Sequence, residues 1–260
     1  MSLSSPLRLQ LEGRCLHLTL SDPSRGNLLN RALIDSLHAA LDQVEATPEL
    51  SLLTISAEGQ TFCDGMDFSE ALGNSGEAAA EIRLAVLRFH ALLEHLARLP
   101  VVVVAMVEGR VNAGGMGLAA ACDLVYALPK ADFGLSEILF GLLPATVNPF
   151  LVRRTGLQAT YRMALTGQRM DAERARACGL VDELISDPAD AIRRLRLRTD
   201  RLDRRAVART KAFYADWAGF NEAAGLKAAD ALASLLCDSQ TLSNIQSFTL
   251  GTPAWLTRSS

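Results

Sequence analysis

Apolar residues repeat with two different periods along the chain and predict strands that alternate with helices. In 14–20, leucine occupies every second position, which is typical of a half-buried strand. In 30–44, apolar residues recur at helical spacing after an asparagine that can cap a helix. The short apolar runs 52–56 and 101–107 fit buried strands, the second because it is β-branched and follows Pro100. Strand, helix and strand in this order predict a layered α/β fold.

Helical spacing of apolar residues dominates the rest of the chain. The glycine-containing stretch 73–76 precedes a long amphipathic helix expected over 79–99. The segment 156–182 predicts a helix, a turn, a second helix that begins after Asp171, and a stop at Gly179.

A break at Asp187-Pro188 separates this mixed pattern from a purely helical one, which is interrupted once more near Gly219. We therefore expect two regions: a core over 1–187, and a helical subdomain over 188–260.

The clearest candidate for chemistry follows the buried run 101–107. That run leads into a glycine-rich turn, 108–117, and a small-residue helix expected over 118–122. A glycine turn between a buried strand and a helix lets the backbone approach a ligand and directs free N–H groups at negative charge. About twenty residues further on, Glu137 is the one carboxylate in an apolar stretch, where burial would raise its pKa and suit it to proton transfer. An anion-binding turn followed by an acid/base group predicts an active site.

Bulk properties exclude several classes of function. The 260 residues are 49% hydrophobic and 21% charged, and the net charge of −3 disfavours non-specific nucleic-acid binding. The chain contains no apolar run long enough to span a membrane and no secretory signal pattern at its start, so we expect a cytoplasmic protein with no membrane partner. Its five cysteines are scattered without metal-ligand spacing, which favours reduced thiols and no metal site.

Two motifs carry a resemblance to a known family. The sequence GRVNAGGMGLAAACDL, followed by FGLSEILFGLLP, resembles the central signature of the enoyl-CoA hydratase/isomerase (crotonase) superfamily, and the similarity extends from about Leu16 to about Val181. The resemblance implies a ClpP/crotonase-like α/β fold of repeated ββα units. It also implies a C-terminal helical region for trimerisation, and hence a homotrimer or a dimer of trimers.

The same resemblance assigns the catalytic groups. The loop 58–68 is similar to the superfamily's first oxyanion loop, so the backbone N–H groups of Met66 and Gly114 would hold the thioester oxygen. Glu137 corresponds to one of the two glutamates of typical hydratases. The position of the other is occupied by Gly117, which cannot transfer a proton and favours a reaction that needs one carboxylate.

Further residues are candidates for substrate binding. Asp64 is a possible second acid beside the first oxyanion loop, and Asn112 could orient a hydroxyl or simply form the turn. Arg83 and Arg88 could bind a substrate carboxylate, although solvated arginines on a helix are the simpler interpretation.

Basic residues near the C-terminus suggest an anionic partner. Arginines are frequent in 193–205, and Lys211 resembles a lysine that meets coenzyme A phosphates in relatives. An acyl carrier protein or coenzyme A would be drawn to such a surface, and an ordinary exposed helix face is the alternative. We expect no cofactor apart from the phosphopantetheine or coenzyme A that carries the substrate.

The segment NAGGMG together with FGLSEILFGLLPATVNPFLVRR looks most like dehydratases of polyketide β-branching. The resemblance implies a hydro-lyase that converts 3-hydroxy-3-methylglutaryl on an acyl carrier protein to 3-methylglutaconyl. The alternatives are the decarboxylase that acts on that product, a coenzyme A-linked enoyl hydratase or isomerase, and a non-catalytic binding subunit with the same fold.

Overall fold

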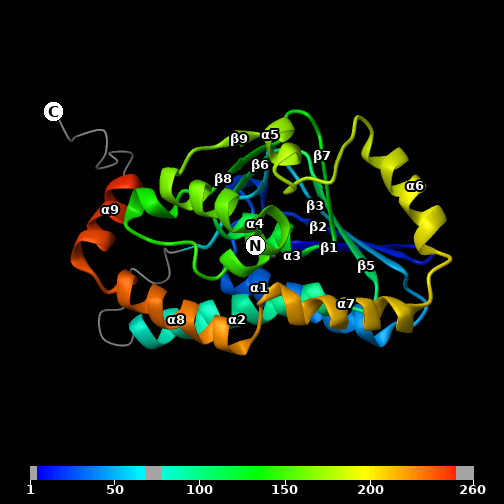
Figure 1. Ribbon diagram of the computed structural model, residues 1–260, viewed down its shortest axis with the longest axis horizontal. Helices are drawn as coiled ribbons and strands as arrows, with labels where there is room; N and C mark the ends of the chain where they lie inside the picture. The colour runs from blue at the N-terminus through cyan, green and yellow to red at the C-terminus, as the bar shows by residue number, and fades with distance from the viewer. Residues whose placement is uncertain (1–4, 68–77, 250–260) are drawn as a thin grey trace.

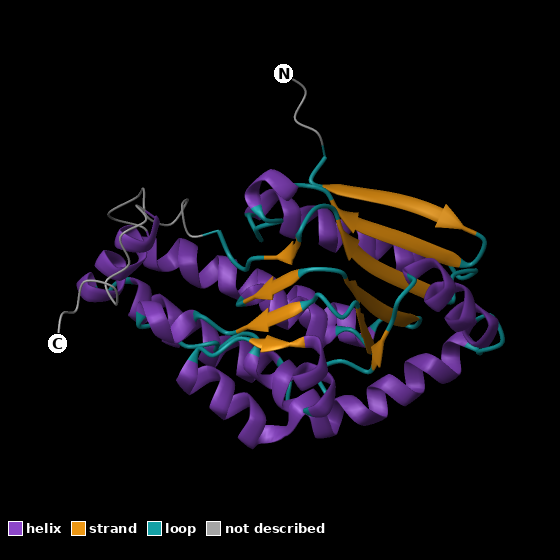
Figure 2. Cartoon of the chain, turned by 90° about the horizontal axis from the view of Figure 1, so that it is seen from above, coloured by secondary structure: helices purple, strands orange, loops and turns teal. Residues whose placement is uncertain are grey.

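Two β-sheets form the centre of the fold, and helices surround them (Figures 1 and 2). The computed structural model describes residues 5–67 and 78–249, so the stretch 73–76 lies outside the described residues. The larger sheet has the strand order β1-β2-β3-β5-β7-β10, with β1 (Leu7–Glu12), β2 (Cys15–Leu20), β3 (Leu52–Ala57), β5 (Val102–Val107), β7 (Leu124–Ala127) and β10 (Glu183–Leu184). The smaller sheet has the order β4-β6-β8-β9, with β4 (Thr61–Cys63), β6 (Arg110–Asn112), β8 (Asp132–Gly134) and β9 (Met170–Asp171).

Successive strands pass from one sheet to the other in a repeating order. The first strand of each of the pairs β3/β4, β5/β6 and β7/β8 joins the larger sheet, and the second joins the smaller one. All neighbouring pairs within β2-β3-β5-β7-β10 and within β4-β6-β8 are parallel. This alternation, with a helix after β4 and after β6, is the repeated ββα unit that the sequence predicted.

Helices pack on both faces of the larger sheet. The main hydrophobic core joins the sheet to α1 (Arg31–Ala46), α2 (Ala78–Arg98), α3 (Gly114–Ala121) and α4 (Asn148–Thr166). A smaller cluster on the other face packs α6 (Pro188–Thr199) against β2, β3 and β5. The remaining helices are α5 (Ala172–Ala177), α7 (Arg204–Ala218), α8 (Glu222–Leu236) and α9 (Ser239–Thr249), with 3₁₀ turns η1 (Pro23–Arg25) and η2 (Glu137–Phe140). Figure 1 shows α8 alongside α2.

Local sequence signals placed most of these boundaries correctly. The Asn30 side chain accepts the Leu33 N–H at 2.9 Å and caps α1, as its position predicted. Asp171 and Asp187 cap α5 and α6 in the same way. The edge strand β1 was not predicted, although leucine occupies every second position in 7–11. In the structure Leu7 is its only buried residue.

The predicted start of the small-residue helix was wrong. α3 begins at Gly114 and not at residue 118, and all eight of its residues are buried. Its glycines allow close packing within a helix: a Cβ on Gly115 would lie 2.4 Å from the Cys63 carbonyl oxygen, and one on Gly117 would lie 2.3 Å from Val147 Cγ1. Buried contacts this tight exclude any larger side chain.

None of the helices within 5–67 and 78–249 is both long enough and apolar enough to cross a membrane.

Adjacent glycines provide a matched test of this packing. We expect Gly115→Ala to lower the free energy of unfolding by about 1–3 kcal/mol or more, because its Cβ would meet backbone atoms that cannot move independently. Gly114→Ala should cost less, since its nearest contact is the flexible end of the Leu29 side chain at 3.0 Å. Urea unfolding of the two variants and the wild type measures the free energy of unfolding that each substitution removes. Equal losses of stability in the two variants would contradict this account of the packing.

Candidate active site

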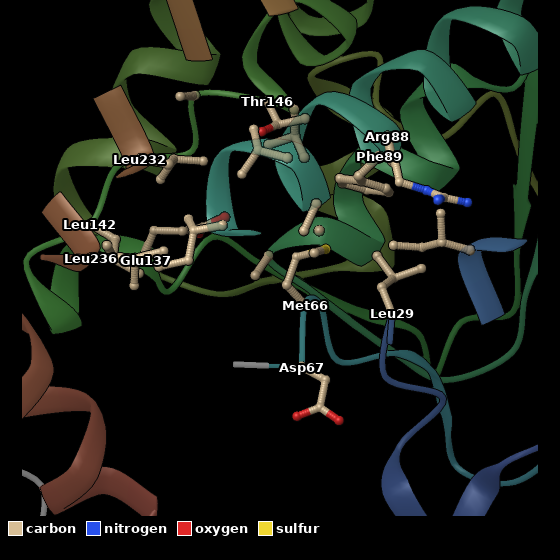
Figure 3. Close-up of a pocket in the computed structure, with 18 of the residues that line it drawn as sticks. Leu29, Met66, Asp67, Arg88, Phe89, Glu137, Leu142, Thr146, Leu232 and Leu236 are labelled. Atoms are coloured by element: carbon tan, nitrogen blue, oxygen red, sulfur yellow. The ribbon is translucent and has the colours of Figure 1, made fainter. Parts of the chain in front are cut away.

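A cavity of about 450 Å³ brings the three main predicted catalytic positions together (Figure 3). Met66, Gly114 and Glu137 all line it, although they come from the loop after β4, the start of α3 and the start of η2. Most of the remaining wall is apolar and is contributed by α1, α2 and α8 and by the segment 142–147. The cavity can therefore exclude water from a small acyl group while presenting few polar groups to it.

Met66 forms a short parallel β-bridge with Leu29, and the backbone geometry directs the Met66 N–H away from that neighbour. The Leu29 N–H donates to the Gly65 carbonyl at 2.8 Å, and the Asp67 N–H donates to the Leu29 carbonyl at 3.2 Å. Because this short bridge uses the groups on either side of Met66, the Met66 N–H faces the opposite direction.

The second donor lies beside the first. Gly114 is the first residue of α3, so its N–H has no acceptor within the helix. A Cβ built on Gly114 would lie only 3.4 Å from the Met66 nitrogen, which shows how closely the two segments approach. Two adjacent backbone N–H groups, one of them at a helix start, can hold a negatively charged oxygen.

Backbone strain marks the residue just before this donor. Ala113 has φ 46° and ψ −118°, a conformation that residues with a Cβ rarely adopt. Its N–H donates to the Gly134 carbonyl at 3.0 Å, which fixes the turn against β8. Strain of about 1–3 kcal/mol per residue persists where the surrounding structure enforces it, and such sites are often functional.

Glu137 has a largely buried carboxyl group with no ion partner among the described residues. Burial is the main cause that raises the pKa of Glu137 to about 7. Its Oε2 atom is buried and makes no hydrogen bond to any described residue. A carboxyl with this pKa exists in both protonation states near neutral pH, so it can accept a proton and return it.

Asn112 lies behind the site and does not line the cavity. Its Nδ2 donates at 3.0 Å to the hydroxyl of Ser136, the residue directly before Glu137. Its Oδ1 accepts from Arg169 Nη1 at 3.3 Å. Arg169 was not singled out by the sequence, where only the preceding turn at Gly167 drew attention to this segment.

Asp64 and Lys211 also lie outside the cavity, and each is held in an ion pair. Asp64 contacts Arg110 at 2.5 Å on the outer side of the loop. The Lys211 ammonium lies 2.6 Å from Asp123 in a largely buried position, and burial lowers the pKa of Lys211. These contacts give Asp64 and Lys211 structural partners and direct both away from the lining of the cavity.

The two arginines of α2 differ in their surroundings. Arg83 points to α8 and pairs with Asp230 at 2.8 Å, outside the cavity lining. Arg88 lines the cavity and pairs with Asp35, which also lies 3.9 Å from Arg31.

The position of the missing glutamate has no room for a side chain. Gly117 is buried, and Val147 fills the space that its side chain would need. The buried Thr146, next to Val147, lines the cavity instead, and Figure 3 shows it across the cavity from Met66. Sequence patterns had not identified Thr146, because a threonine in a loop carries no specific signal.

Metal binding and nucleophilic catalysis by cysteine can be compared with the part of the chain that the structure describes. No group of three or more His, Cys, Asp or Glu side chains there is arranged to hold a metal ion. Cys63, near the oxyanion loop, is fully buried, and burial raises the pKa of its thiol to about 12.

Comparison with known proteins agrees with the fold. The family model for enoyl-CoA hydratase/isomerase matches residues 11–246. The bacillaene synthase dehydratase PksH of Bacillus subtilis is 31% identical over 212 residues, which cover 80% of this chain and 79% of PksH. The crystal structure of a polyketide biosynthesis enoyl-CoA hydratase (pksH) from Bacillus subtilis matches with TM-score 0.85 and 28% identity, covering 95% of this chain and 98% of that one. The crystal structure of an enoyl-CoA hydratase from Mycobacterium avium matches with TM-score 0.87 and 27% identity, and the match covers 97% of this chain and 100% of that one. The chain therefore belongs to the enoyl-CoA hydratase/isomerase family and has its crotonase fold.

Proposed function

We propose that the protein is a hydro-lyase that removes water from a 3-hydroxyacyl thioester. The observation that carries this proposal is the Glu137 carboxyl, which has a pKa of about 7 and lines the same cavity as Met66 and Gly114. Its Oε2 atom is buried without a hydrogen-bond partner among the described residues. Proton transfer needs such a group, whereas charge stabilisation alone needs only the two backbone donors.

The reaction can proceed with Glu137 as the single acid/base. Its carboxylate removes a proton from the carbon next to the thioester carbonyl, and the C–H electron pair leaves negative charge on the thioester oxygen. The Met66 and Gly114 N–H groups donate hydrogen bonds to that oxygen, and each contributes roughly 3 kcal/mol of stabilisation. When the carbonyl re-forms, the C2–C3 double bond forms and the C3 hydroxyl departs, taking the proton from Glu137 to leave as water.

The single-carboxylate mechanism agrees with the packing at Gly117. Val147 occupies the space where a second carboxylate would be placed, so Glu137 would perform both proton transfers. Its pKa near neutrality suits both roles, because neither protonation state is strongly favoured.

The substrate we propose is 3-hydroxy-3-methylglutaryl on the phosphopantetheine of an acyl carrier protein, which would give 3-methylglutaconyl. Similarity to the bacillaene synthase dehydratase PksH and the motif resemblance support this choice. We further propose that no cofactor is needed beyond the substrate's carrier, that the enzyme works in the cytoplasm, and that it assembles as a homotrimer or a dimer of trimers through its C-terminal helices.

A coenzyme A-linked hydratase is the second candidate. It is favoured by similarity to the enoyl-CoA hydratase of Mycobacterium avium. Decarboxylation of 3-methylglutaconyl is less well supported, because loss of CO₂ needs no base, and Glu137 would serve only to protonate the resulting dienolate.

Replacing Glu137 tests its catalytic role. We expect Glu137→Gln, which preserves the shape of the side chain, to lower kcat by about 10²–10⁴-fold because it cannot accept the α-proton. Intact-mass analysis of an acyl carrier protein loaded with 3-hydroxy-3-methylglutaryl, with the coenzyme A ester in parallel, would follow loss of one water. The control is Glu94→Gln, since Glu94 pairs with Arg98 on α2 outside the cavity. Turnover by Glu137→Gln at the wild-type rate would refute the mechanism.

The raised pKa of Glu137 also predicts a pH-dependent stability. Between pH 4.5 and about 7 the unfolded chain releases the Glu137 proton while the folded protein keeps it, so rising pH removes up to about 3 kcal/mol of stability. Glu137→Gln is neutral throughout and should escape this loss. Urea unfolding at pH 5, 6, 7 and 8 should therefore show that the free energy of unfolding of the variant rises relative to that of the wild type as pH increases. If the difference in free energy of unfolding between the two proteins did not change with pH, the pKa of Glu137 would not be raised in the folded protein.

A further inference from the structure

The proposed substrate carries negative charge outside its thioester, and the cavity supplies few groups to meet it. That charge resides on the distal carboxylate of the acyl group and on the phosphate of the phosphopantetheine arm. Among the described residues that line the cavity, the only cations are Arg31 and Arg88. Arg83, the other arginine predicted to bind a carboxylate, faces Asp230 on α8 and takes no part in the lining.

Arg31 and Arg88 share one counterion. Both guanidinium groups contact Asp35, one through each carboxylate oxygen, so two positive charges are balanced by one negative charge. All three side chains are accessible: Arg31 is 78% exposed, Arg88 40% and Asp35 44%. An arriving oxyanion can therefore reach the guanidinium groups without first breaking a buried ion pair.

The start of α1 adds positive potential at the same place. Asn30 and Arg31 line the cavity at the N-terminal end of this 16-residue helix, where the helix dipole favours negative charge. Figure 3 shows Arg88 and Glu137 on opposite sides of Met66. The positive end of the cavity is thus separated from Glu137, whose raised pKa it would otherwise lower.

We propose that Arg31 and Arg88 form an anion subsite that binds an oxyanion group of the substrate outside the thioester. This inference rests on the proposed function for the identity of the ligand. The occupant is either the distal carboxylate or the arm phosphate, which share the same hydrogen-bonding chemistry.

Binding of unreactive analogues tests the subsite without any turnover. The probes are amides in which NH replaces the thioester sulfur: glutaryl and butanoyl amides, each made on pantetheine and on 4′-phosphopantetheine. Isothermal titration would compare the wild type with Arg88→Gln and Arg31→Gln. Arg83→Gln is the matched control, since it removes the same charge from α2 outside the cavity.

We expect the wild type to bind one anionic analogue about tenfold to a hundredfold more tightly than its neutral counterpart, and Arg88→Gln to abolish that preference. Loss of the glutaryl preference identifies the carboxylate, and loss of the phosphate preference identifies the arm. Arg31→Gln, at an exposed position, should weaken the same preference without affecting folding. The subsite is refuted if the wild type shows no preference for either anion, or if Arg83→Gln has the same effect as Arg88→Gln. Loss of water from the loaded carrier protein is measured in a separate experiment. A failure of the proposed dehydratase function can therefore be distinguished from a failure of the subsite proposal.

A second inference concerns Arg169, which contacts both of the strands that lead into the catalytic groups. Its Nε donates to Asp132 Oδ2 at 2.5 Å and its Nη2 to the Asp132 carbonyl at 3.2 Å, both in β8. The same Nη2 donates to the Val111 carbonyl at 3.3 Å, and Nη1 donates to Asn112 Oδ1 at 3.3 Å, both in β6. A Cβ on Gly134 would lie 2.6 Å from Nη1, so the guanidinium packs directly on the backbone there.

These contacts connect the two halves of the site. β6 leads through Ala113 to the Gly114 donor, and β8 leads through Ser136 to Glu137. We infer that Arg169 is a positioning residue that fixes the distance between the oxyanion donors and Glu137. It acts through Asn112, whose Nδ2 holds the Ser136 hydroxyl.

Steady-state kinetics of Arg169→Met distinguish this role from a purely structural one. We expect kcat to fall by about tenfold to a hundredfold with little change in KM. We also expect the pH midpoint of kcat to shift from about 7 toward the ordinary pKa of glutamate, because Glu137 gains access to water. Arg174→Gln is the control, because the Arg174 side chain is 69% exposed and pairs with Asp171 at 4.0 Å, away from β6. A variant that loses stability but keeps the wild-type kcat and pH midpoint per folded molecule would overturn the inference.

Discussion

Contact between the start of α3 and the loop after β4 is the constraint on which the site depends. At Gly115 the helix approaches the Cys63 carbonyl so closely that a Cβ would lie 2.4 Å from it. This approach places the Gly114 N–H beside the Met66 N–H, and the strained Ala113 completes the turn that allows it. Because both donors belong to the backbone, side-chain packing and strand pairing have to set their positions. The smaller sheet does so by pairing β4 and β6 as parallel neighbours.

Burial of Glu137 is the second requirement, and the C-terminal helices contribute to it. Leu232 and Leu236 of α8 line the cavity on the side of Glu137, as Figure 3 shows. α9 packs against η2, where the Asn244 side chain donates to the Phe140 carbonyl at 3.4 Å. The apolar surroundings raise the pKa of the carboxyl by desolvation. A helical region far along the sequence thereby sets the acid/base properties of a residue in the core.

Periodicity and caps were sufficient to predict the main strands and helices, and the motifs placed Met66, Gly114 and Glu137 in one cavity. The sequence could not show contacts that depend on a distant partner. Asp64, Arg83 and Lys211 were candidates for substrate binding, but their partners Arg110, Asp230 and Asp123 come from other elements and hold them outside the cavity. Arg169 was missed for the same reason, since its contacts with β6 and β8 join residues far apart in the chain. The start of α3 was mispredicted because glycine usually signals a turn, whereas here it permits close packing within a helix.

Removal of the α-proton by Glu137, with the charge held by two backbone N–H groups, is the central claim. Its most direct test uses 3-methylglutaryl on the carrier protein, a substrate analogue that lacks the C3 hydroxyl and cannot lose water. In D₂O, the account predicts that the wild-type enzyme exchanges the α-hydrogen for deuterium, which mass spectrometry detects, and that Glu137→Gln does not. If the wild type eliminates water from the hydroxylated substrate but exchanges no α-hydrogen in this analogue, or if Glu137→Gln exchanges as fast as the wild type, the enolate mechanism is contradicted.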